Sequence, residues 1–137
     1  MNTKLAVLAS LCVLACGCGG SQEGAQTCSG FDLDVEKVWN AEVKAKVMGY
    51  GGEIGGEMGQ KVVTRMDNLT RDWVMLRESA CRDHQRGFLS DDEYKAKVTC
   101  FDGFLQNVRT MLTALESGGD ADAVNQILQS QGVTQCQ

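Results

Sequence analysis

Cysteine and histidine are the residues of this chain with the most specific chemistry, and the chain has seven cysteines and one histidine. His84 stands three residues after Cys81. A neighbouring imidazole can activate a thiol as a nucleophile or as a redox centre. One hypothesis is therefore a thiol-redox or other small enzyme that uses Cys81 and His84. The alternative is that His84 is a surface residue near a helix end, beside a structural disulfide.

The spacing of these residues does not favour a metal site. The sequence contains no C-x-x-C and no H-x-x-x-H pattern, whereas a zinc site needs ligands that converge on one point. We expect neither a metal nor another cofactor.

A glycine-rich stretch from Gly49 to Gly59 reads GYGGEIGGEMG. Its spacing matches neither G-x-G-x-x-G nor the phosphate-binding loop that ends in Lys-Ser/Thr. Glycines at this density interrupt a helix. We expect a flexible connection between two helices, and a mobile lid over a groove is the alternative.

The charge balance argues against a nucleic-acid partner. The chain has 18 Asp and Glu against 13 Lys and Arg, and nucleic-acid-binding domains usually carry a basic face. No block of Lys or Arg is present that would grip phosphates or anionic lipid. Proline is absent, which leaves helices uninterrupted.

The first residues read as a targeting segment rather than as part of the fold. Lys4 supplies a positive charge, and residues 5–15 form an apolar run on the order of ten residues, too short to span a bilayer. The run ends in the letters VLAC, with the last letter at Cys16. This pattern resembles the lipobox of bacterial lipoproteins.

The lipobox resemblance implies cleavage before Cys16 and attachment of lipid to that residue. Residues 1–15 are then a signal peptide, 16–27 a flexible tether, and 28–137 the folded domain. An ordinary signal peptide cut nearby, or lipidation at Cys18, are the alternatives. Because Gly17 rather than Asp follows Cys16, resemblance to enterobacterial lipoproteins favours the outer membrane over the inner one, with the domain facing the periplasm or the cell surface.

Export places the remaining cysteines in an oxidising compartment, where most of them should pair. Cys18 beside the lipid is the one expected to be left over. The other four allow three connectivities. We expect Cys81 to pair with Cys100 across a helical hairpin, and Cys28 to pair with Cys136, which joins the two ends of the domain.

Apolar residues recur at spacings of four and three over two long stretches, as on one face of an α-helix. The first helix is expected from about Glu57 to Gln85. A second begins after Ser90, which with Glu93 forms a capping box, and ends near Gly118. The apolar positions are Val62, Met66, Leu69, Trp73, Leu76 and Ala80 in the first helix, and Tyr94, Val98, Phe101, Leu105, Val108, Leu112 and Leu115 in the second.

Shorter helical patterns flank this pair. Phe31 to Trp39 reads as a short amphipathic helix, with a restart at Asn40, and a last short helix follows Asp120 with Ala123, Val124, Ile127 and Leu128 inward. Two long helices joined by a short loop should pack antiparallel. The sequence therefore predicts an all-α fold: a small antiparallel helical bundle built on a long hairpin and stapled by disulfides.

From Cys28 to Cys136 the pattern resembles the extracytoplasmic, cysteine-containing helical segment that precedes tetratricopeptide repeats in large bacterial receptor-type Ser/Thr kinases. The chain has no kinase domain and no repeat array, so kinase activity is not expected. The resemblance implies a sensing or docking module without assigned catalytic residues. The matching residues are Cys28, Val38, Trp39, Trp73, the run from Arg77 to Cys81, Cys100, Phe101 and Cys136.

Three functions follow from these observations. The first is a lipid-anchored, non-enzymatic cell-envelope module for binding, sensing or protein interaction, whose partner is an unidentified envelope protein or ligand. The second is the thiol enzyme at Cys81 and His84. The third is a purely structural envelope lipoprotein. Trp39 and Trp73 are large enough to recognise a partner, but both lie on apolar faces, so we expect them in the core.

Overall fold

The computed structural model describes residues 27–49, 56–118 and 121–137. These residues form helices and connections, with no β-strand among them, which confirms the all-α prediction. The expected signal peptide, the lipidation site Cys16, Cys18 and most of the glycine-rich stretch lie outside the described residues.

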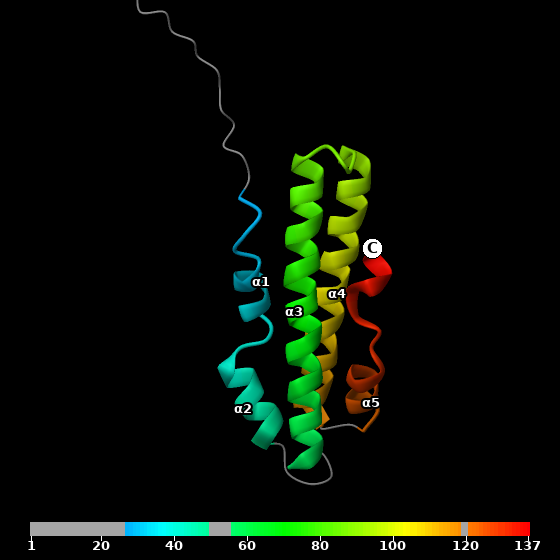
Figure 1. Ribbon diagram of the computed structural model, residues 1–137. Helices are drawn as coiled ribbons and strands as arrows, with labels where there is room; N and C mark the ends of the chain where they lie inside the picture. The colour runs from blue at the N-terminus through cyan, green and yellow to red at the C-terminus, as the bar shows by residue number, and fades with distance from the viewer. Residues whose placement is uncertain (1–26, 50–55, 119–120) are drawn as a thin grey trace, which may run out of the picture.

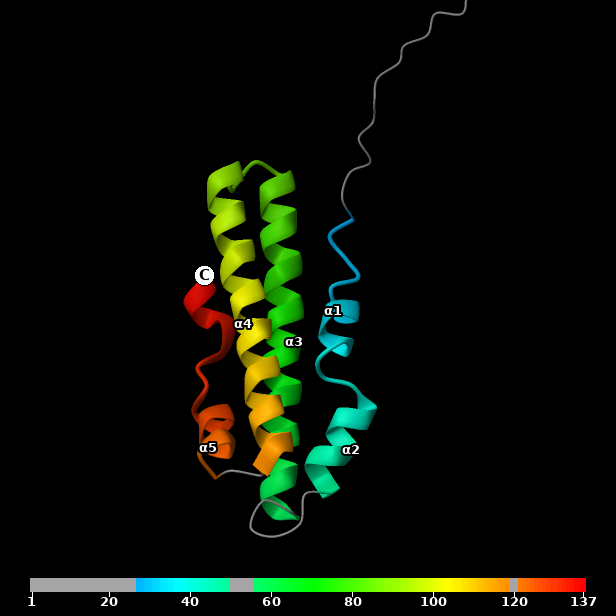
Figure 2. The same cartoon turned by 180° about the vertical axis from the view of Figure 1, so that it is seen from behind.

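The two long helices form the centre of the bundle. The elements are α1 (Asp32–Glu36), α2 (Ala41–Gly49), α3 (Glu57–Gln85), α4 (Asp91–Gly118), α5 (Ala121–Gln129) and a 3-10 helix, η1 (Gly132–Cys136). Helices α3 and α4 form an antiparallel hairpin (Figure 1). The views from front and back place α1 and α2 on one side of this hairpin, and α5 with the C-terminus on the other (Figures 1 and 2).

The apolar face predicted for α3 is the centre of the core. Five of its six positions are buried, and Leu76 is partly buried against them. The bounds of this helix agree with the prediction. Trp73 is 1% exposed, and its indole Nε1–H donates to the carbonyl oxygen of Phe101 over 2.8 Å. This bond fixes the level of α3 relative to α4.

The predicted helix starts are also confirmed. The backbone N–H of Ser90 donates to Glu93 Oε2 over 2.8 Å, and the N–H of Glu93 donates to Ser90 Oγ over 3.3 Å, as in a capping box. The side chain of Asn40 accepts from two backbone N–H groups at the start of α2. Helix α1 is shorter than the apolar pattern suggested, because Val38 and Trp39 follow it in a turn, yet both are buried.

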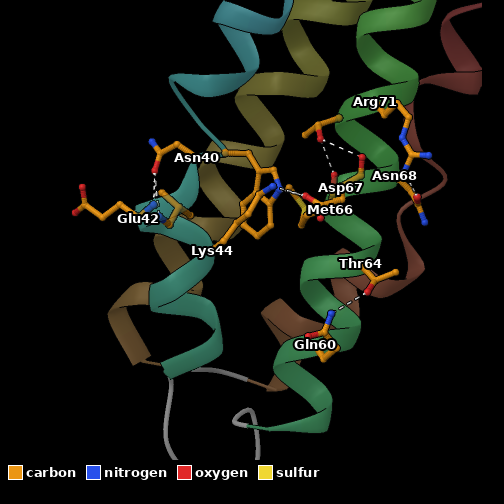
Figure 3. Close-up of polar contacts among 12 residues, drawn as sticks. Asn40, Glu42, Lys44, Gln60, Thr64, Met66, Asp67, Asn68 and Arg71 are labelled. Atoms are coloured by element: carbon orange, nitrogen blue, oxygen red, sulfur yellow. Dashed lines mark hydrogen bonds and ion pairs between the residues drawn. The ribbon is translucent and has the colours of Figure 1, made fainter.

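A polar cluster around Asp67 joins α2 to α3 (Figure 3). Asp67 Oδ1 accepts from Trp39 Nε1 over 2.7 Å and lies 2.7 Å from Lys44 Nζ. Partial burial raises the pKa of Asp67, but the hydrogen bonds from Lys44 and Trp39, together with the charges of Lys44 and Arg71, outweigh it and leave the pKa below 3.8. The N–H of a buried indole thus has a hydrogen-bond acceptor, and the carboxylate has a donor, at this junction.

The C-terminal segment adopts a 3-10 helix that the sequence did not predict. Gly132 opens it with φ +71°, a conformation that favours glycine. A Cβ atom at this position would lie 2.8 Å from Leu69 Cδ2. Close packing against α3 and the positive φ therefore both require glycine, and they bring Val133 and Cys136 into the core.

All four expected cysteines form disulfides, but the predicted pairing of Cys81 with Cys100 and of Cys28 with Cys136 is wrong. The bonds join Cys28 to Cys81 and Cys100 to Cys136, with Cα–Cα distances of 5.5 and 5.7 Å. The hairpin is therefore not stapled to itself. Each disulfide instead attaches one end of the domain to one of the long helices.

The register of the hairpin explains the difference. The bond from Trp73 places that residue level with Phe101, the neighbour of Cys100. Cys81 lies eight residues beyond Trp73, about 12 Å further along α3 at ~1.5 Å per residue. A disulfide needs Cα atoms within about 7 Å. Cys81 and Cys100 are therefore too far apart along the axis of the hairpin to form one.

Peptide mapping tests the connectivity. Trypsin cleaves after lysine and arginine, which places the four cysteines on four different peptides, one of them Glu78–Arg82. Without reduction, we expect mass spectrometry to find Glu78–Arg82 linked to the peptide that contains Cys28. A link from Glu78–Arg82 to the peptide of Cys100 or Cys136 would contradict the structure.

With sequence separations of 53 and 36, each bond is expected to stabilise the fold by about 4 kcal/mol in the chain-entropy account.

The Asp67 cluster gives a pH prediction. A lowered carboxyl pKa in the folded state stabilises the protein above the unfolded pKa, near 3.8, and this contribution is lost as pH falls through the folded pKa. We expect Asp67→Asn, which keeps an acceptor for Trp39, to be less stable than the unsubstituted protein at pH 7 by up to about 1 kcal/mol. The difference should shrink steadily in urea unfolding curves taken below pH 4.

Asp72→Asn on the exposed side of α3 is the matched control for the loss of one carboxylate. It should leave the urea midpoint nearly unchanged at pH 7. A constant difference between Asp67→Asn and the unsubstituted protein from pH 7 to pH 3 would show that the ion pair of Asp67 is not the cause.

Candidate functional site

A groove of about 600 Å³ opens where the start of the described chain meets the C-terminal half of α3 and the N-terminal half of α4. It lies beside the Cys28–Cys81 disulfide, because Cys81 contributes to its wall. Its size is within the usual range for small-molecule sites, roughly 300–1,000 Å³. The residues around it are Thr27, Phe31, Arg77, Cys81, Tyr94, Lys95, Val98 and Thr99.

Arg77 is the central residue of this groove. Its guanidinium carbon lies 4.7 Å from the ring centroid of Phe31 and 5.6 Å from that of Tyr94. Its Nη1–H also donates to the Tyr94 hydroxyl over 3.0 Å. The cation therefore contacts two aromatic rings that come from different elements, and each ring attracts it through its quadrupole.

Three elements place these side chains. Arg77 lies four residues after Trp73 on α3, so the two side chains lie on the same face of the helix, one turn apart. The Cys28–Cys81 bond holds the segment before α1 against α3, and the Phe31 ring meets Trp73 edge-on, with centroids 6.4 Å apart. Tyr94 stands on the first turns of α4, which the capping box at Ser90 starts.

His84 packs against the Tyr94 ring. The two rings are stacked, with centroids 4.4 Å apart and planes within 6°. His84 Nε2 donates to Asp91 Oδ1 over 2.7 Å. The hydrogen bond from His84, with the charges of His84 and Lys95, lowers the pKa of Asp91 below 3.8. Aromatic stacking and this bond together fix the orientation of Tyr94.

The groove carries positive charge on an acidic protein. Two of its residues, Arg77 and Lys95, are cations and none is an acid, although the chain has a formal net charge of −5. Three other grooves on the described residues differ: one has no charged residue, and the other two contain both signs of charge. The groove at Arg77 is thus complementary to a negative ligand.

The predicted thiol site has a different geometry from the one that activation requires. The sulfur of Cys81 is bonded to Cys28, and Cys81 is 3% exposed. The imidazole of His84 is directed to Asp91 and Tyr94. In this state Cys81 presents no thiolate. Cys81 borders the groove, whereas His84 contacts it only through Tyr94.

The sequence alone does not single out Arg77, which is half-buried and lies against the rings of Phe31 and Tyr94. A weak signal was present: Arg77 lies midway between the buried residues Trp73 and Cys81 on one side of α3. Phe31 and Tyr94, however, come from distant parts of the sequence. The spacing within α3 alone does not reveal them.

The part of the chain that the structure describes contains neither a membrane-spanning helix nor a cluster of metal ligands. No helix there combines the length and apolar character that crossing a bilayer requires. No group of three or more His, Cys, Asp and Glu side chains there is arranged to hold a metal ion.

Comparison with known proteins adds no relative: no protein-family model matches this chain, and no curated protein and no solved structure matches it.

A double-mutant cycle tests the contact of Arg77 with Phe31. We compare Phe31→Leu, Arg77→Met and the double variant by urea unfolding, because the cycle isolates the pairwise term from the cost of each change. The coupling free energy should be about 0.5–1 kcal/mol, the range of cation–π pairs near a surface. Additive effects of the two substitutions would mean that the contact does not stabilise the fold.

Proposed function

We propose that this protein is a lipid-anchored, non-enzymatic module of the cell envelope that binds a ligand or partner in the groove at Arg77. The observation that carries the binding proposal is the groove itself, which combines cations, aromatic rings and a volume of about 600 Å³. Recognition sites are concave, largely apolar and provided with a few placed polar groups. This groove has those properties.

The anchor rests on the sequence around Cys16. The lipobox-like letters VLAC precede a Gly-, Ser- and Gln-rich stretch with no apolar periodicity, which is the composition of a flexible spacer. Thr27, the first described residue, borders the groove. The chain that follows the anchor therefore enters the domain next to the proposed site, so a sensing or docking role near a membrane surface is consistent with both features.

The thiol-enzyme alternative has less support. A redox-active disulfide must be reached by an attacking thiolate, whereas Cys81 is almost fully buried and its partner Cys28 is only partly exposed. The resemblance to the extracytoplasmic segments of receptor-type kinases also favours docking or sensing over catalysis. We therefore propose that both disulfides act as structural cross-links.

Substitution at Cys16 tests the anchor. In a bacterial host that exports lipoproteins, we expect the unsubstituted protein in the membrane fraction, with a mature N-terminus at Cys16 and the added mass of diacylglycerol and an acyl chain. Cys16→Ser should remove that mass and shift the protein to the soluble fraction or leave it as an uncleaved precursor. Cys18→Ser is the matched control and should remain lipidated.

Two results would contradict the proposed anchor. One is a soluble mature protein without lipid, which would indicate an ordinary signal peptide. The other is loss of the lipid mass in Cys18→Ser with retention in Cys16→Ser, which would assign the modification to Cys18.

A further inference from the structure

We propose that the groove at Arg77 binds a carboxylate that is attached to a small apolar group, as at the C-terminus of a peptide. The inference rests on the proposed function, since it names the ligand class of the same groove. It follows from the unsatisfied donors of Arg77, the second cation at Lys95 and the apolar surfaces that surround them.

Several N–H groups of the Arg77 guanidinium have no hydrogen-bond acceptor among the described residues. It presents five N–H groups, and its hydrogen bond within the described residues goes to the Tyr94 hydroxyl. No carboxylate pairs with it, since none of the ion pairs of the described residues includes Arg77. Its nitrogens are also not among the buried atoms that lack a partner, unlike Nε of Arg65. The remaining donors are therefore not buried, and they belong to a residue that borders the groove.

The contacts with two rings limit the conformations that the Arg77 side chain can adopt. With Phe31 and Tyr94 in contact with the guanidinium, at 4.7 and 5.6 Å from its carbon, the side chain has already lost much of its rotamer freedom. A ligand that binds it does not have to order it again, which favours affinity. A planar guanidinium offers paired N–H groups that match the two oxygens of a carboxylate.

Lys95 adds a second positive charge to the same groove. It is exposed on α4, and its charge acts on Asp91 one turn earlier. None of the salt bridges of the described residues occupies its ammonium group. Phe31 and Val98 provide apolar surface beside the two cations. A carboxylate near Arg77 and Lys95 would thus leave room for an attached apolar side chain against Phe31 or Val98.

The surroundings favour a small soluble anion over the headgroups of an anionic bilayer. Asp91, Asp92 and Glu93 are exposed on the first turn of α4, directly before Tyr94 and Lys95. An extended negative surface brought to this end of the hairpin would meet those three carboxylates. A single carboxylate inside the groove meets the cations instead.

NMR titration of the full mature chain in uncharged detergent micelles tests the inference. The probe is N-acetyl-leucyl-leucine with a free C-terminal carboxylate, and its C-terminal carboxamide is the matched control. We expect saturable shifts of the amide signals of Arg77, Tyr94 and Lys95 with the acid, and at least about tenfold weaker binding of the amide, because a charge-assisted bond is lost.

Three variants connect the binding to the named side chains. Arg77→Lys keeps the charge but not the planar fork, and should weaken binding about tenfold. Lys95→Gln changes an exposed side chain, so it should leave the fold intact and weaken binding several-fold. Arg109→Gln removes one exposed positive charge elsewhere on α4 and should not change the affinity.

Each remaining outcome would overturn the inference. These are equal binding of acid and amide, unchanged affinity in both Arg77→Lys and Lys95→Gln, and no saturable shift at all. Shifts of the same residues with inorganic phosphate or with phosphatidylglycerol vesicles, and none with the peptide acid, would reject the carboxylate but leave binding in the groove and the lipid anchor standing.

Discussion

The hydrogen bond from the Trp73 indole to the Phe101 carbonyl is the interaction on which the rest of the structure depends. It joins the two long helices within the core, at 2.8 Å. A buried indole N–H without a partner is costly, so α3 cannot slide along α4 without breaking this bond. Because the register of α3 and α4 is fixed here, the levels of Cys81, Arg77 and Tyr94 are fixed as well.

That register determines how the ends of the domain are attached. Cys81 lies too far along the hairpin axis from Cys100 to bond to it. It bonds instead to Cys28, in the segment before α1. Cys100 holds the C-terminal 3-10 helix in the same way. The first of these bonds brings Phe31 to Arg77, while the fixed register brings Tyr94 to the same guanidinium. The groove is thus a product of one hydrogen bond and one disulfide.

Much of the fold was predictable because its signals are local. Ser90 and Glu93 stand three residues apart, and the apolar face of α3 repeats within one helix, so both were found from the sequence. The disulfide pairing was not, because it depends on the contact between Trp73 and Phe101, which are distant in the chain. Arg77 was missed for the same reason, since its rings come from other elements.

The central claim is that the Cys28–Cys81 bond builds the groove by placing Phe31 on Arg77. Nuclear Overhauser contacts between the Phe31 ring protons and the δ-methylene of Arg77 test it most directly. We predict that they are present in the unsubstituted protein and lost in Cys28→Ala/Cys81→Ala, while contacts between Trp73 and Phe101 persist in both. Contacts from Phe31 to Arg77 that survive the loss of the disulfide, or that are missing from the unsubstituted protein, would contradict the account.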